Sequence, residues 1–360
     1  MIDSDMSERL VNEYTTSRGT YDDLVAAAVD LLKKLISESG VQLYSVTGRA
    51  KSIDSLKQKL TKPNREYGAL GQVTDLAGVR VITYLVDDVG TVGQYIEREF
   101  DVDTTNSIDR GKALDPDRFG YASVHYVVRM KAARTALLEY KRFANVPFEI
   151  QVRSILQHAW AEIEHDLGYK TKESIPTEVQ RRFSRLAGLL ELADSEFDGI
   201  RTSLTQYREQ VTRDVGAHKD VELNKDSLLA LLNSDPHVRA LDQLVAAEMK
   251  AALVQQPSDL LADRMVSWLR NAGLPTTQAV SAAADKYKGK VAALARTWLD
   301  GKTYETTGAG IGTFYLAYLL AASRGDVTVV SAFLDSNNIG ESSKRRLMAE
   351  RLVKIVASLS

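Results

Sequence analysis

Three polar side chains alternate with three apolar ones between Phe148 and Arg153. The polar set is Glu149, Gln151 and Arg153. Because a strand sends successive side chains to opposite faces, this stretch predicts one apolar face and one face with a carboxylate, an amide and a guanidinium. Such a row fits the solvated face of an edge strand. It also fits a nucleotide or metal site, which often forms where a strand runs into a helix.

The residues after this strand predict a helix. Apolar side chains recur at helical spacing at Leu156, Ala159, Trp160, Ile163 and Leu167. One face of the same helix would hold His158, Glu162 and His165. These three groups could bind a metal, or they could form a hydrogen-bonded network on a core helix.

Basic residues surround a predicted strand-to-helix turn. The sequence favours a short strand at 41–47 and a helix at 52–60. The basic residues around the turn are Arg49, Lys51, Lys57 and Lys59. Cationic side chains beside the free N–H groups of a helix start suit a polyphosphate. A solvated, lysine-rich helix is the alternative interpretation.

Two further strands have candidate groups at their ends. Asp75 precedes a strand at 79–85 and could bind Mg²⁺ together with substrate phosphates, or could only form a turn. Tyr121 and His125 share one face of a strand at 120–128. The tyrosine could stack on a base and the histidine could reach a phosphate, or both could belong to the core.

The composition is that of an ordinary soluble protein. The chain has 360 residues, of which 44% are hydrophobic and 26% charged, and its formal net charge is −2. This length allows two or three domains, and this charge provides no bulk positive field for nucleic acid or membrane. The chain has no cysteine, which excludes disulfides, thiolate zinc sites and cysteine nucleophiles.

No membrane or export segment is predicted. Met1 to Leu10 lacks the apolar stretch of a signal peptide, and the longest apolar run, Ile311 to Ala322, is too short to span a bilayer. We therefore expect a cytoplasmic protein.

The pattern of elements predicts an α+β domain, with a mixed sheet flanked by helices, followed by an all-α domain. We expect an N-terminal tail at 1–20, the first domain at 21–213, a polar linker at 214–224 and a helical domain at 225–360. The expected helices of the last domain are 225–234, 236–254, 258–271, 276–285, 288–300, 310–323, 327–334 and 340–358.

Two glycine-containing stretches in the last domain resemble parts of nucleotide-binding sequence motifs. Gly301-Lys302-Thr303 ends like a P-loop, but Arg296 stands where the leading glycine belongs, and a helix rather than a strand precedes it. The stretch 308–312 lacks a preceding strand and the full dinucleotide spacing. Both are interpreted as turns or caps.

Taken together and in order, five blocks resemble the synthetase domain of the RelA/SpoT alarmone synthetase family. The blocks are 46–51 (VTGRAK), 75–80 (DLAGVR), 120–125 (GYASVH), 148–153 (FEIQVR) and 161–170 (AEIEHDLGYK). The resemblance covers about residues 20 to 213 and does not extend to 225–360. It implies a fold related to the polymerase-β nucleotidyltransferases.

The resemblance implies a pyrophosphokinase that uses Mg²⁺ to move the β,γ-pyrophosphate of ATP onto the 3′-hydroxyl of a guanosine nucleotide, GDP or GTP. Carried over residue by residue, it implies ATP binding by Arg49, Lys51 and Lys59. It implies magnesium binding by Asp75 and by Glu149, which is also the catalytic glutamate. It implies acceptor binding by Tyr121, which would stack on guanine, by His125, and by Gln151 and Arg153 beside Glu149.

One departure concerns the acceptor. Family members that make alarmones usually have a lysine and an asparagine before the Gly-Tyr pair, whereas Asp117-Arg118-Phe119 stands here. A toxin-like enzyme acting on the 3′ end of tRNA or on adenosine nucleotides is therefore an alternative. A second hypothesis is a catalytically weak binding module whose helical domain does the biological work. That domain could regulate, inhibit or oligomerise the protein.

Overall fold

The computed structural model describes residues 4–62, 67–109, 123–169, 176–254, 257 and 259–359. The chain divides into two compact units, Met1–Arg201 and Thr202–Ser360. Each unit has its own hydrophobic core. No helix among the described residues is long and apolar enough to cross a membrane.

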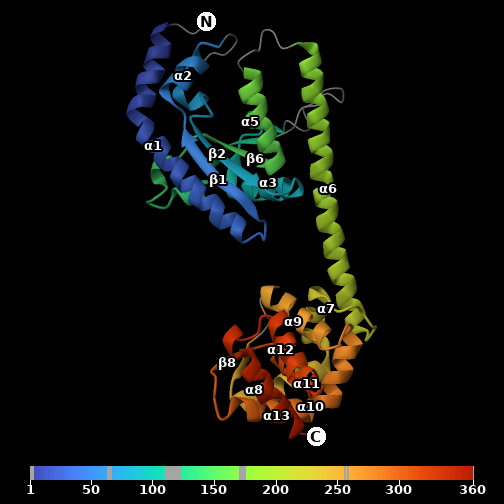
Figure 1. The fold of residues 1–360 in the computed structure, drawn as a ribbon. Coiled ribbons are helices and arrows are strands. Elements are labelled where there is room, and N and C mark those ends of the chain that lie inside the picture. Colours follow the sequence, from blue (N-terminus) through green and yellow to red (C-terminus); the bar gives the residue numbers. More distant parts are fainter. Residues whose placement is uncertain are drawn as a thin grey trace. The chain divides into compact units, whose positions relative to one another are not determined.

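The first unit is built on a six-stranded mixed sheet with the order β1-β2-β6-β5-β3, in which β4 also pairs with β5 (Figure 1). The strands are β1 (Leu43–Ala50), β2 (Ala77–Thr83), β3 (Phe100–Val102), β4 (Ile108–Asp109), β5 (Val124–Met130) and β6 (Phe148–Ser154). The β2–β6 pair is parallel, and the β1–β2, β5–β6, β3–β5 and β4–β5 pairs are antiparallel. The predicted mixed sheet is therefore confirmed.

Helices flank this sheet. They are α1 (Ser4–Ser37), α2 (Ile53–Leu60), α3 (Asp87–Glu99), the short α4 (Ala132–Thr135), α5 (Ile155–Tyr169) and α6 (Thr177–Gly216). Helix α1 packs on β1 and β2, and α3 packs on β6. The apolar side chains of β2 and β6 lie in the same core as those of α1 and α3, including Val79, Ile150, Leu24 and Ile96. The polar side chains of β6 alternate with its buried apolar ones and so point to the opposite face of the sheet.

The N-terminus differs from our expectation of a tail at 1–20. Helix α1 begins at Ser4, and Leu10 and Tyr14 are completely buried in the core of the first unit. These side chains recur at helical spacing with Tyr21 and Leu24, so one stripe of a single long helix covers the sheet.

A close approach between α1 and β1 requires a glycine at position 48. A Cβ atom there would lie 2.6 Å from Cγ1 of Val25 and 3.1 Å from the carbonyl oxygen of Gly78. Any larger residue would push the strand away from the helix, and Arg49 with it.

The second unit is mainly helical. Its helices are α7 (Lys225–Ser234), α8 (Pro236–Met249), α9 (Asp259–Asn271), α10 (Thr277–Leu299), α11 (Ile311–Ala322), α12 (Val327–Ser336) and α13 (Arg345–Ala357). The two helices expected at 276–285 and 288–300 form the single helix α10, which continues through Gly289. The structure adds a short parallel strand pair, β7 (Ala252–Val254) with β8 (Thr306–Gly308).

The stretch expected as a linker belongs to the second unit. Its first residues continue α6, and Val211 and Val215 of this helix lie in the second core. Farther on, the backbone N–H of Leu223 donates to the carbonyl oxygen of Pro275, and the N–H of Thr277 donates to that of Val221. The backbone at 221–223 is therefore hydrogen-bonded to its own unit, rather than free as a linker.

The glycine-rich stretch at 308–312 is occupied by a side chain of the same unit. Backbone N–H groups of Gly310 and Gly312, at the start of α11, each donate to a different oxygen of Asp242 at 2.7 Å. Asp242 is 2% exposed, and burial raises its pKa to about 6. This internal carboxylate fills the position that a phosphate would take in a nucleotide motif, in agreement with the interpretation as a helix cap.

Candidate active site

The polar side chains of β6 lie on the face of the sheet opposite to α1 and α3. Glu149 is paired in register with Gly78 of β2 and with Val127 of β5. Gln151 is paired with Arg80 of β2 and His125 of β5. Because directly opposed residues point to the same face, the three strands bring these polar groups together.

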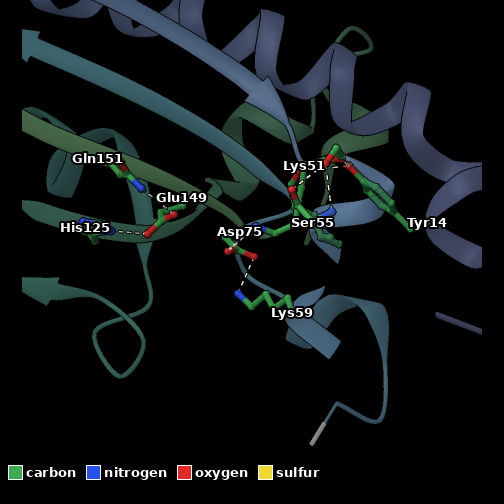
Figure 2. Close-up of polar contacts among 10 residues, drawn as sticks. Tyr14, Lys51, Ser55, Lys59, Asp75, His125, Glu149 and Gln151 are labelled. Carbon is green, nitrogen blue, oxygen red and sulfur yellow. Dashed lines mark hydrogen bonds and ion pairs between the residues drawn. The ribbon is translucent and has the colours of Figure 1, made fainter. Parts of the chain in front are cut away.

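A chain of hydrogen bonds runs along this face. The Oγ atom of Ser123 lies 2.7 Å from Nε2 of His125. The Nδ1 atom of His125 lies 2.5 Å from Oε1 of Glu149 (Figure 2). On the other side, Nε2 of Gln151 donates to Oε2 of Glu149 at 3.2 Å, and Nη2 of Arg153 donates to Oε1 of Gln151 at 3.3 Å. Both oxygens of Glu149 are therefore held by neighbouring side chains.

Glu149 is held in its ionised form. Burial works against the charge, but the hydrogen bond from His125, followed by that from Gln151, holds the pKa of Glu149 below its usual range. The nearby charge of Asp75 acts in the opposite direction. A carboxylate that is ionised, partly exposed and fixed in orientation can accept a proton from a hydroxyl group.

A second cluster joins α2 to the loop before β2. The Nζ atom of Lys51 lies 3.0 Å from Oδ2 of Asp75, and the Nζ atom of Lys59 lies 2.7 Å from Oδ1 (Figure 2). Burial again opposes the charge, yet the ammonium groups of Lys59 and Lys51 hold the pKa of Asp75 below its usual range. Two cations and one anion leave a local excess of positive charge for a polyphosphate.

Local structure fixes Lys51 in this cluster. Its backbone N–H donates to the carbonyl oxygen of Leu76 at 2.8 Å, and its own carbonyl oxygen accepts from the hydroxyl of Tyr14 at 2.6 Å. The next residue, Ser52, caps α2 by accepting from the N–H of Ser55. Tyr14 thus connects the N-terminal helix to the site, a connection that the sequence did not indicate.

The structure places most of the predicted site residues in these two clusters. Glu149, His125, Gln151 and Arg153 belong to the hydrogen-bonded chain, and Asp75, Lys51 and Lys59 belong to the cationic cluster. Arg49 is exposed on β1, opposite Gly78, and so shares the polar face. Tyr121 lies outside the described residues.

His125 has a different arrangement from the one expected of a phosphate contact. Both ring nitrogens are engaged within the protein, and its side chain is only 10% exposed. Ser123 lies two residues before His125 on the same strand face, and no role was predicted for it from the sequence. The structure shows that its hydroxyl is the far end of the chain to Glu149.

Arg80 also belongs to this face, although we had assigned it no role. It lies opposite Thr47 and Gln151, and its Nη1 donates to Oε1 of Glu162 at 2.9 Å. This ion pair uses the carboxylate that we had considered as a metal ligand with His158 and His165. The described residues contain no group of three His, Asp or Glu side chains that could hold a metal.

Part of this chain is similar to known proteins. Residues 48–174 match the family model described as a region found in RelA / SpoT proteins. GTP pyrophosphokinase YjbM of Bacillus subtilis is 29% identical over 168 residues, which cover 47% of this chain and 76% of that protein. GTP pyrophosphokinase YwaC of the same species is 28% identical over 161 residues, with coverages of 42% and 71%.

A solved structure also aligns with part of this chain. The small alarmone synthetase 1 from Bacillus subtilis, bound to its product pppGpp, aligns at 26% identity with a TM-score of 0.46. The alignment covers 54% of this chain and 99% of that one. The match to the RelA / SpoT family model lies entirely within the first unit. The matched residues 48–174 include all nine predicted site residues.

Proposed function

We propose that this protein is an ATP-dependent pyrophosphokinase that forms (p)ppGpp-type alarmones. It would transfer the β,γ-pyrophosphate of ATP to the 3′-hydroxyl of GDP or GTP. The observation that carries the proposal is the position of Glu149. Its ionised carboxylate is fixed at both oxygens and is close enough to Asp75 for the two charges to interact. The names of the two Bacillus subtilis relatives support guanosine nucleotides as acceptors.

The reaction needs three contributions from the chain. The 3′-oxygen of the acceptor attacks the β-phosphorus of ATP, the bond between this phosphorus and the α,β-bridging oxygen breaks, and AMP leaves. Glu149 would take the hydroxyl proton. Lys51, Lys59 and Arg49 would bind the phosphates and offset their charge. In transfers of this kind, positioning and electrostatics do most of the work.

The two carboxylates fit a divalent cation. The charge of Asp75 is near enough to disfavour that of Glu149, and Mg²⁺ binds one or two carboxylates together with substrate phosphates. We propose that these two residues hold Mg²⁺. When bound, the ion would stabilise the negative charge that develops on the transferred phosphates. Lys51 and Lys59, which now neutralise Asp75, would turn to the phosphates of ATP.

The acceptor is tested with the full-length protein, ATP labelled at the γ-phosphate and Mg²⁺. GDP, GTP, ATP and deacylated tRNA are offered separately, and each reaction is repeated with Glu149→Gln. The proposal predicts labelled guanosine product with GDP or GTP. Label in tRNA or in an adenosine product alone would favour the toxin-like alternative, to which the sequence before Tyr121 also points. Label in no acceptor would favour a binding module without catalysis.

We also propose that the second unit regulates the first. The active-site residues of the family match lie within the first unit, and the second unit has a core of its own. The test compares the full chain with a version ending at Arg201, for transfer rate, oligomeric state and effect on cell growth. A folded first unit that matches the full chain in all three would contradict regulation.

A further inference from the structure

The hydrogen-bonded chain that ends at Glu149 begins at a side chain with no assigned role. Ser123 is 7% exposed, so the solvent hardly reaches it. Its Oγ lies 2.7 Å from Nε2 of His125. Ser123 immediately precedes β5 and lies two residues before His125, so both side chains point to the polar face.

We infer that Ser123 is a positioning residue, which acts through His125 to fix the orientation of the Glu149 carboxylate. The inference rests on the proposed function, in which Glu149 accepts the proton of the acceptor hydroxyl. It differs from a catalytic role because Ser123 is buried and hydrogen-bonds to His125 rather than to the carboxylate itself.

The argument depends on which ring nitrogen of His125 carries the hydrogen. A serine hydroxyl has one hydrogen to donate, and donation to Nε2 leaves the imidazole hydrogen on Nδ1. There it is donated to Oε1 of Glu149, 2.5 Å away. In the opposite tautomer, a bare Nδ1 would face a carboxylate oxygen at this distance, and two acceptors would repel each other.

Glu149 needs this support because its other oxygen has a weaker partner. Gln151 donates to Oε2 at 3.2 Å, which is longer than the contact from His125. If the ring of His125 lost its contact with Ser123 and turned, the carboxylate of Glu149 would turn about its hydrogen bond to Gln151. A shift of this kind moves the proton acceptor away from the hydroxyl, and a misplacement of about 1 Å can cost on the order of 100-fold in rate.

The inference predicts that Ser123→Ala lowers kcat by roughly 10- to 100-fold. The KM values for ATP and GDP should change less than about threefold, because Lys51, Lys59 and Arg49 are untouched. Ser123→Thr keeps the hydroxyl and should restore most of kcat. The matched control is Ser107→Ala. Ser107 also bonds to β5, by accepting from the N–H of Val127 at 3.0 Å, but is not connected to Glu149.

A second readout does not depend on activity. The chain contains five histidines, so the full-length protein labelled with ¹⁵N-histidine should give a resolvable spectrum of imidazole nitrogens. The His125 signals are identified by their absence in His125→Gln. We expect the Nδ1–H tautomer in the wild type and in Ser107→Ala. In Ser123→Ala we expect a mixture of the two tautomers, because the ring can turn away from Glu149 once Nε2 has lost its partner.

The inference is overturned if the wild type shows the Nε2–H tautomer at His125. It is also overturned if Ser123→Ala retains kcat within twofold of the wild type, or if Ser123→Thr is as slow as Ser123→Ala. A wild type that transfers nothing to GDP or GTP would instead contradict the proposed function, and the tautomer measurement would still decide the role of Ser123.

Discussion

The ammonium nitrogen of Lys59 lies 2.7 Å from Oδ1 of Asp75, so a residue assigned to ATP is paired with a residue assigned to the metal. Both side chains are largely buried, with 14% and 24% of their surfaces exposed. The pair keeps Asp75 ionised before substrate arrives. If ATP and Mg²⁺ bind as we propose, their binding would rearrange Lys59 and Asp75 together.

This arrangement predicts the effect of Lys59→Met. A charge-assisted hydrogen bond contributes roughly 1.5–3 kcal/mol, so its loss should raise the KM for ATP by roughly 10- to 100-fold. The KM for the acceptor should change little. Lys57→Met is the matched control, because Lys57 is exposed on the same helix. Equal KM values for ATP in the two variants would show that Lys59 only partners Asp75.

Asp75→Asn should raise the Mg²⁺ concentration needed for half-maximal activity, or abolish activity at any concentration. The amide keeps the shape but leaves one fewer carboxylate for a hard cation. The measurement is a Mg²⁺ titration of the transfer rate, with the exposed Asp54→Asn as control. If the Mg²⁺ titration were unchanged, the role of Asp75 would be limited to its ion pairs with the two lysines.

Glu149→Gln should lower kcat by roughly 100- to 10,000-fold, because the amide cannot accept the hydroxyl proton. Thermal unfolding should stay close to that of the wild type, since the side chain keeps its volume. The exposed Glu139→Gln serves as control. Turnover near that of the wild type would show that Glu149 does not take part in the reaction.

Asp242 in the second unit should make the free energy of unfolding depend on pH. Burial raises the pKa of Asp242 from 3.8 to about 6. The folded state therefore holds this proton more tightly than the unfolded state. Its contribution to the free energy of unfolding is greatest below pH 3.8 and is lost as the pH rises through about 6. The loss amounts to roughly 3 kcal/mol at 1.36 kcal/mol per pKa unit.

Asp242→Ala tests this, because it removes the titrating group and leaves the N–H groups of Gly310 and Gly312 without their acceptor. The variant should be less stable than the wild type by several kcal/mol at low pH, and the gap should narrow between pH 4 and 7. The measurement is urea unfolding of both proteins across this range. A gap that is constant with pH would contradict the raised pKa.

The site could be predicted from the sequence where a short local pattern determined it. The alternation from Phe148 to Arg153 has the period of a strand, and the structure places Glu149, Gln151 and Arg153 on one face. The helix expected at 52–60 forms α2, and Ser52 is its N-cap. Such features depend on neighbours in the chain, so one sequence contains enough information.

Contacts between distant residues could not be predicted in this way. The pairing of Lys51 with Asp75 joins residues 24 positions apart, and that of His125 with Glu149 depends on the register of β5 against β6. The sequence did contain an indication that Tyr14 is buried, since its spacing to Tyr21 and Leu24 fits one face of a helix. Polar and charged residues between them made the segment look like a tail.

The most direct test of the account is the identity of the nucleotide that ATP leaves behind. The full-length protein is incubated with GDP, Mg²⁺ and ATP labelled at both the β- and γ-phosphates. The products are then separated, and their masses are measured by mass spectrometry. The account predicts AMP without label, in equal amount to a guanosine nucleotide that has gained both labelled phosphates at its 3′-oxygen. Formation of ADP with a single transferred phosphate, or of no labelled guanosine product, would contradict it.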